Sequence, residues 1–108
     1  MRAFEAACAL ARSHGVRVAF DDLGDWAPAV LFSEYDASAR TIAVNLRIAT
    51  RFRERLGETF AGDFCAAAVL HELRHATAGD GEDAAHAAVR AAGFEPSLYE
   101  ATWRAVRA

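Results

Sequence analysis

The chain of 108 residues has no lysine, two cysteines, two prolines and no long uncharged apolar run. Cys8 and Cys65 are too few for a disulfide framework and match no zinc motif, so we expect reduced, buried thiols. No uncharged stretch approaches the roughly 20 residues that span a bilayer, so the sequence predicts no membrane helix. The N-terminus lacks the apolar stretch of a signal peptide, which favours a cytoplasmic protein.

The charge balance argues against a nucleic-acid-binding protein. Twelve basic residues, all arginine, and fifteen acidic ones give a net charge of −3. Arg47, Arg51 and Arg55 share one face of a predicted helix, but no aromatic residues interleave with them in a stacking pattern. Glu54 and Glu58 lie nearby, so a solvated helix face is the favoured interpretation.

The length fits one domain covering residues 1–108. Apolar residues make up 54% of the chain and charged residues 25%, which is typical of a globular protein. Much of the apolar fraction is alanine, so the predicted core is modest, and a bound metal could contribute to its stability.

The order of the predicted elements gives an α+β class. Periodicity predicts three short strands, over residues 16–20, 28–32 and 41–45. Strands this close in sequence favour a small, mostly antiparallel sheet, with a turn at residues 35–38. One helix is predicted before the sheet and several after it, over residues 2–14, after 46, and over 63–78, 82–92 and 96–106, with a loop at 57–62.

The chemistry is concentrated in His71-Glu72-Leu73-Arg74-His75. Residues four apart lie on one face of a helix, so His71 and His75 can present two imidazoles to one ion. Glu72 lies about 100° further round the helix, where it is a poor ligand but can contact a metal-bound water. Zinc lowers the pKa of that water, and the carboxylate can accept its proton and pass it on. This spacing predicts a hydrolytic Zn²⁺ site.

Hydrolytic zinc takes three protein ligands and leaves one position open. The candidates for the third ligand are Asp80, Glu82, Asp83 and His86. Asp83 falls on a solvent-directed face, and Asp80 would require the turn to fold over the metal. A helix that returns antiparallel favours His86, whereas a more splayed helix favours Glu82. The residue that does not bind can orient a ligand from outside.

The sequence resembles the HExxH zinc metallopeptidases, in particular the minimal gluzincin peptidases and more loosely the ImmA/IrrE-like group, over roughly residues 15–92. Three segments carry the resemblance, namely residues 41–45, 69–75 and 82–88. It implies a zincin-like domain in which the HExxH helix is followed by further helices, with Glu82 as the third ligand. His86 stands where the family often has an acid, and a SprT-like arrangement would make it a third histidine instead.

The resemblance and the motif together predict zinc-dependent hydrolysis of a peptide or protein, with Glu72 as general base and acid. Tyr35 and Tyr99 are candidates for stabilising an oxyanion by residue type, but packing is the favoured interpretation of both. The segment over residues 99–103 follows the site and could cover it. The alternative function is a binding or regulatory protein that a non-catalytic zinc stabilises.

Overall fold

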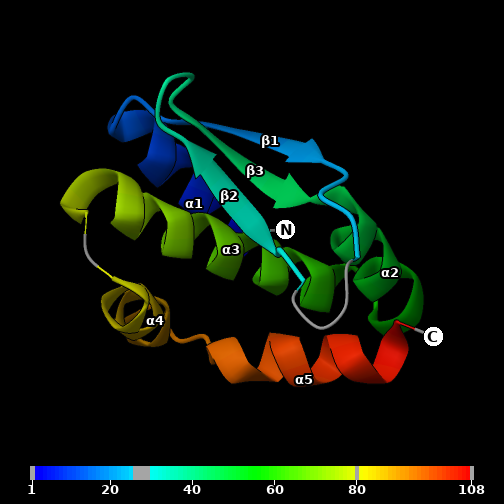
Figure 1. Cartoon of the computed structure of the whole chain (residues 1–108). Coiled ribbons are helices and arrows are strands. Elements are labelled where there is room, and N and C mark those ends of the chain that lie inside the picture. Colours follow the sequence, from blue (N-terminus) through cyan, green and yellow to red (C-terminus); the bar gives the residue numbers. More distant parts are fainter. Residues whose placement is uncertain (1, 26–29, 80, 108) are drawn as a thin grey trace.

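The computed structural model of the chain describes residues 2–25, 30–79 and 81–107. These residues form five helices and a three-stranded mixed sheet, which confirms the α+β class (Figure 1). In chain order the elements are α1 (Arg2–Ser13), β1 (Arg17–Asp21), β2 (Ser33–Asp36), β3 (Thr41–Asn45), α2 (Leu46–Leu56), α3 (Glu58–Ala78), α4 (Glu82–Ala91) and α5 (Pro96–Val106).

The sequence predicted a mostly antiparallel sheet, but the observed sheet is mixed. Its strand order is β1-β3-β2, with β1 parallel and β2 antiparallel to the central β3. The long connection from β1 to β2 carries the chain past the middle position, which β3 then fills (Figure 1). β1 therefore pairs with β3 and not with β2, the strand that follows it in sequence.

The prediction of a strand over residues 28–32 is wrong in its position. Residues 28 and 29 lie outside the described residues. The strand begins at Ser33, opposite Val44 of β3. Continuing this register would place Phe32 opposite Asn45, where β3 ends, and the Asn45 N–H donates to the Phe32 carbonyl at 2.8 Å. The ladder cannot extend further because β3 turns directly into α2. For the same reason the turn follows β2 at residues 37–40, later than predicted.

Helix α3 begins five residues before its predicted start. The segment 57–62 was expected to be a loop, but only Gly57, with φ +94°, interrupts the helices there. Gly62 is buried inside α3, and Asp63 lies within the helix and does not cap it. A glycine in a helix costs about 1 kcal/mol relative to alanine. Continuous backbone hydrogen bonding and burial of this first part of α3 outweigh that propensity.

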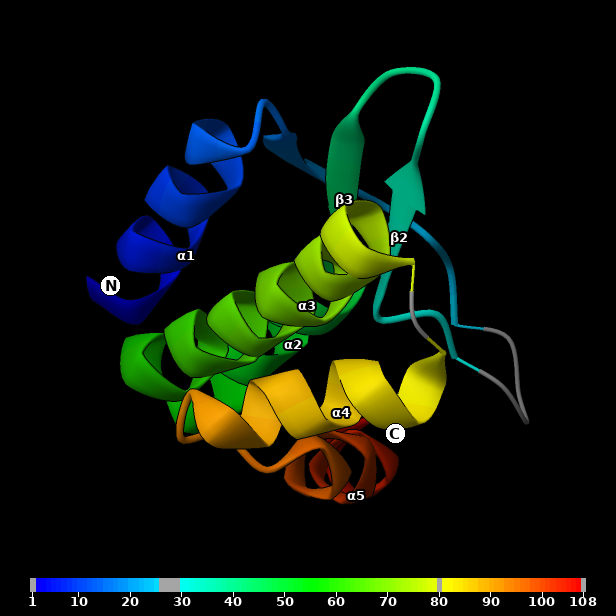
Figure 2. The same ribbon diagram turned by 90° about the vertical axis from the view of Figure 1, so that its left-hand side faces the viewer.

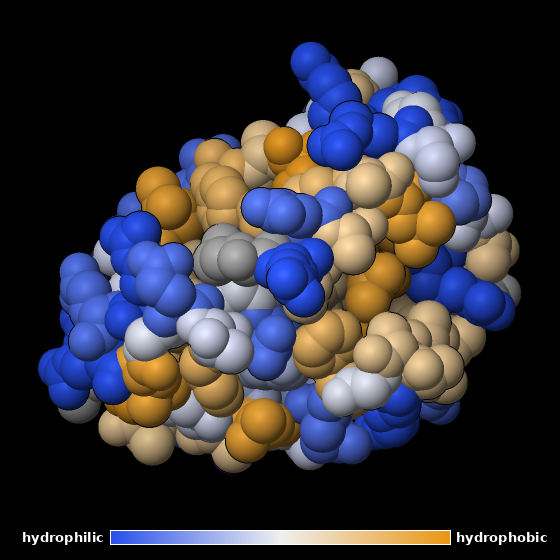
Figure 3. Space-filling model, turned by 180° about the vertical axis from the view of Figure 1, so that it is seen from behind, coloured by the Kyte–Doolittle hydropathy of each residue, from blue (hydrophilic) through white to orange (hydrophobic). Residues whose placement is uncertain are grey.

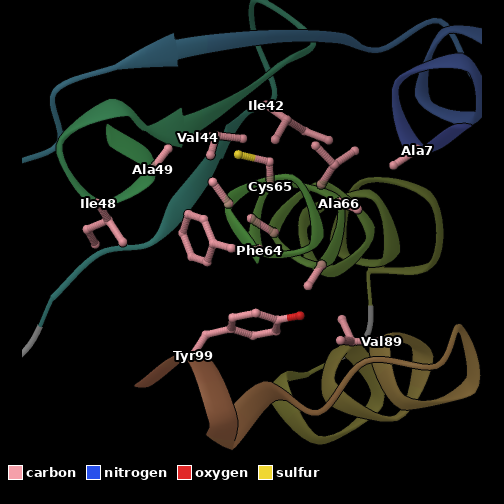
Figure 4. Close-up of a cluster of buried hydrophobic side chains, with 14 of the residues drawn as sticks. Ala7, Ile42, Val44, Ile48, Ala49, Phe64, Cys65, Ala66, Val89 and Tyr99 are labelled. Carbon is pink, nitrogen blue, oxygen red and sulfur yellow. The ribbon is translucent and has the colours of Figure 1, made fainter. Parts of the chain in front are cut away.

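Helix α3 runs through the centre of the molecule and contacts α1, α2, α4, β2 and β3 (Figures 1 and 2). Its buried positions are mainly small residues, which allows neighbouring elements to approach closely. Larger side chains from the neighbouring elements fill the space around it, including Ile42, Val44, Ile48, Val89 and Tyr99 (Figure 4). Phe52 and Phe64 meet edge to face, with ring centroids 5.0 Å apart.

Both cysteines are free thiols in the structure. Cys65 lies in the core of α3, where burial raises the pKa of its thiol to about 12, with a smaller contribution from Cys8. Cys8 is partly buried, and burial raises its pKa as well, against a smaller effect of Arg12. The two thiols are therefore protonated packing groups at neutral pH.

The remaining large hydrophobic side chains are dispersed over the surface. Those left exposed come from different parts of the chain, namely Leu10, Phe20, Leu31, Leu46, Leu56 and Leu98. Hydrophobic and hydrophilic residues are also interspersed on the face that lies behind Figure 1 (Figure 3). None of the described helices is long and apolar enough to cross a bilayer.

Asn45 joins three parts of the fold at the end of β3. Its side chain is fully buried and caps α2 by accepting from the Arg47 N–H at 3.2 Å. The same side-chain oxygen accepts from the Leu23 N–H, and the amide donates to the carbonyls of Gly24 and Leu31. One side chain thus satisfies four backbone groups in the long β1–β2 connection and at the start of α2.

We expect Asn45→Ala to destabilise the fold by roughly 2–4 kcal/mol, because it removes a helix cap and leaves buried backbone groups unpaired. The midpoint of thermal unfolding should fall by about 10–20 °C. Circular dichroism measured against temperature checks this, with Arg53→Ala on the exposed face of α2 as the control. A shift no larger than that of the control would contradict the role given to Asn45.

Candidate metal centre

The last turns of α3 present two histidines on one face. His71 and His75 are one helical turn apart, with ring centroids separated by 4.9 Å, and both side chains are partly buried. The helix ends at Gly79, whose φ of +67° reverses the chain direction. The tight turn predicted around residues 79–81 agrees with this ending, and Asp80 lies outside the described residues.

Helix α4 crosses α3 steeply and does not return antiparallel to it. In Figure 1 α3 lies along the plane of the view while α4 is seen nearly end-on, and Figure 2 shows α4 passing below the last turns of α3. The first residue of α4, Glu82, is consequently brought beside the two histidines. This is the splayed arrangement that the sequence left open as the one favouring Glu82 over His86.

Three potential donor atoms form a tight triangle. Nε2 of His71 and Nε2 of His75 are 3.3 Å apart. Oε1 of Glu82 lies 2.7 Å from Nε2 of His75 and 3.3 Å from Nε2 of His71. All three atoms therefore lie together between the two helices.

The spacing of these atoms fits a small divalent metal. With zinc–nitrogen bonds of 2.0–2.1 Å, the ligands of a tetrahedral site lie about 3.3 Å from one another. The contact between His75 and Glu82 holds a proton that metal binding would replace, because ligands must be deprotonated. His/Glu clusters here could thus hold a metal ion.

No protein-family model, curated protein sequence or solved structure matches the chain.

Glu72 is not one of the three residues of the triangle, but its carboxylate lies beside them. Its Oε2 is 3.8 Å from Nε2 of His71, and the side chain is buried against the sheet. Ser33, at the start of β2, is also buried and donates from Oγ to Oε2 of Glu72 at 2.9 Å. No local sequence pattern indicates this partner, since Ser33 is 39 positions away and only the packing of β2 on α3 joins the two.

The remaining candidates lie further from the triangle. His86 is one turn beyond Glu82 on the same face of α4, with Nε2 3.7 Å from Oε2 of Glu82. The donor atoms of His71, Glu82 and His86 lie within 4.8 Å of one another. Asp83 is exposed, as its helical position predicted. His14 lies at the end of α1, where Nδ1 contacts the Leu10 carbonyl at 3.0 Å.

The two histidines favour the charged form of Glu82. Partial desolvation raises the pKa of Glu82, but the hydrogen bond with His75 and the charges of His71 and His75 lower it by more. The pKa therefore lies below the ordinary value of a glutamate. Glu82 is a carboxylate at neutral pH, which is the form that binds a cation.

A cleft of about 1050 Å³ opens beside the cluster. Segment 30–35 forms one side, α4 and α5 form the other, and Ala67 and Ala68 of α3 line its floor. His71, Glu72 and Glu82 lie among its walls. Two of the three donor residues and the buried carboxylate of Glu72 therefore share one open cavity of the size that binds ligands.

The two tyrosines differ in their surroundings. Tyr99 packs against Phe60 and Phe64 and is nearly buried, and this burial raises its pKa to about 12, with a smaller effect of Asp63. Tyr35 is partly buried on β2 and lines the cleft. Tyr99, Glu100 and Trp103 line the same cleft from α5, and Tyr99 also belongs to the buried core (Figure 4).

We expect purified protein to bind about one zinc ion per chain, and His75→Ala or Glu82→Ala to remove it, since each variant takes away one of three ligands. Elemental analysis after dialysis checks this. Zinc at 100 times its Kd should stabilise the wild type by roughly 3 kcal/mol and leave His75→Ala unchanged. His14→Ala, which changes a histidine remote from the cleft, is the control. Absence of bound zinc in the wild type would contradict the metal site.

Proposed function

We propose that this protein is a zinc-dependent peptidase of the zincin-like kind, in which His71, His75 and Glu82 hold the metal. The observation that carries the proposal is that three donor atoms lie within 3.3 Å of one another, and that two of their residues, His71 and Glu82, line a cleft together with the buried Glu72. A purely structural metal site has no need of that glutamate.

The metal would bring Lewis acidity to the cleft and lower the pKa of a water there. Glu72 accepts a proton from the attacking water and delivers it to the departing amine nitrogen. Its Oε2 is held by Ser33, so the other oxygen remains available for the transferred proton. Ser33 is thus a positioning residue, which acts through Glu72 and does not contact the substrate atoms that react.

The walls of the cleft suit an extended peptide. Strand β2 is an edge strand of the sheet, and its residues Ser33, Glu34 and Tyr35 line the cleft. The edge of such a strand can pair with an extended chain through main-chain hydrogen bonds. Such pairing holds a peptide across the cleft floor at Ala67 and Ala68, next to Glu72. A peptide or protein is therefore the substrate class that we propose.

A second candidate function is a zinc-stabilised binding protein without turnover. The proximity of a further donor, His86, favours it, because structural zinc sites are closed by four protein ligands. In that case Glu72 is only a buried carboxylate satisfied by Ser33. Replacing Glu72 separates the two functions.

We expect Glu72→Gln to keep its zinc and its fold while the rate of peptide hydrolysis falls by roughly 10²–10⁴-fold, because the amide cannot accept the proton. Hydrolysis of a fluorogenic peptide library, with zinc content and thermal stability measured in parallel, checks this. Arg74→Ala, on an exposed position of α3, is the matched control. Equal rates in the variant and the wild type would leave the second candidate function.

We expect Ser33→Ala to lower kcat by about tenfold with little change in KM, since the carboxylate loses the donor that orients it. Ser33→Thr keeps the hydroxyl and should restore most of the rate. Steady-state kinetics of both variants check this, with zinc content as a second measurement. If the rate of Ser33→Ala fell only in proportion to a loss of folded protein, the serine would be structural.

A further inference from the structure

His86 has a donor atom close to the metal cluster but does not belong to its triangle. It is 39% exposed, on the cleft face of α4, and its ring centroid is 5.2 Å from that of His71. Among the described residues its polar contact is with Oε2 of Glu82, at 3.7 Å. Oε1 of the same carboxylate faces the other two histidines. Glu82 therefore lies between His86 and the triangle.

From its observed position, the His86 side chain needs only a small movement to reach a metal bound by the triangle. Ligands of a tetrahedral zinc site lie about 3.3 Å apart. Its donor atom is within 4.8 Å of those of both His71 and Glu82, so a rotation of an exposed side chain is sufficient to close the gap. With His75, the chain then offers three imidazoles and one carboxylate to a single ion.

We propose that His86 is a reversible fourth ligand, which closes the metal site when the cleft is empty and withdraws when substrate enters. This rests on the proposed function, because it describes how the same zinc would alternate between a closed and an open form. Four protein ligands are typical of structural sites, whereas catalysis requires an open position. The closed form would retain the metal tightly in a small domain and exclude water from it.

The position of His86 explains why substrate would displace it. The histidine lines the same cleft as Glu72 and segment 30–35, so a peptide lying along the cleft competes for its space. His71 and His75 are less exposed and project from the central helix, so they stay in place. The exchange thus requires movement of only one exposed side chain.

The test replaces zinc by Co²⁺, whose visible absorption is stronger in four-coordinate than in five-coordinate sites. The wild type, His86→Ala and His86→Gln are each loaded with Co²⁺, with His14→Ala as the control. Water in place of the imidazole keeps Co²⁺ four-coordinate, so we expect both His86 variants to show a shifted spectrum without the intensity loss of a five-coordinate site. Their Co²⁺ affinity should be at least roughly tenfold lower, the effect of losing even an outer partner of a ligand. Free imidazole should restore the wild-type spectrum of His86→Ala.

Access to the open coordination position is measured as the affinity for acetohydroxamate, a chelating metal ligand. We expect it to bind Co²⁺-loaded His86→Ala more tightly than the wild type, because no side chain has to leave. Identical spectra and identical acetohydroxamate affinities in the wild type and both variants would overturn the fourth-ligand role while leaving the zinc peptidase proposal intact. Failure of the wild type to bind Co²⁺ at all would instead overturn both proposals.

Discussion

The enclosure of α3 on most of its sides determines both the fold and the site. Helices α1, α2 and α4 and the strands β2 and β3 all contact it, and small residues such as Ala66 allow this close approach. A helix in this position has little freedom to shift or rotate. The side chains of its last turns, His71, Glu72 and His75, are therefore directed by the packing of the whole molecule. Their mutual geometry is held by the core and not by a flexible loop.

The second consequence of this enclosure is the different environment of neighbouring side chains. Glu72 faces the sheet and is satisfied by Ser33, whereas His71 and His75 face the cleft and Glu82. Helical periodicity creates this division, because adjacent residues point about 100° apart. The buried carboxylate of Glu72 and the two imidazoles are thus separated within a few residues of one helix.

Helical periodicity also places Glu82 and His86 on one face of α4. Their spacing of four residues places both on the cleft face, so the steep crossing of α4 over α3 offers two further donors to one position. A site with more donors than an open zinc requires can be closed or opened without a change in the fold. In the role that we propose for His86, stable metal retention and access of substrate would depend on this one side chain, which suits a domain with a modest core.

The sequence by itself determined the α+β class, β3, the C-terminal end of α3, the start of α4, and the spacing of His71 and His75, because these follow from local periodicity, glycine positions and helical geometry. It did not determine where β2 lies, since that strand is limited by the register with β3 and by the early start of α2 at Leu46. Residues 58–62 were mispredicted because burial overrode the low helix propensity of Gly62, whereas Gly57 does interrupt the helices. Ser33 as the partner of Glu72, and the nearness of Glu82 to the histidines, were decided by tertiary structure alone. Both depend on how β2 packs on α3 and on the angle at which α4 crosses it, and no local pattern encodes either.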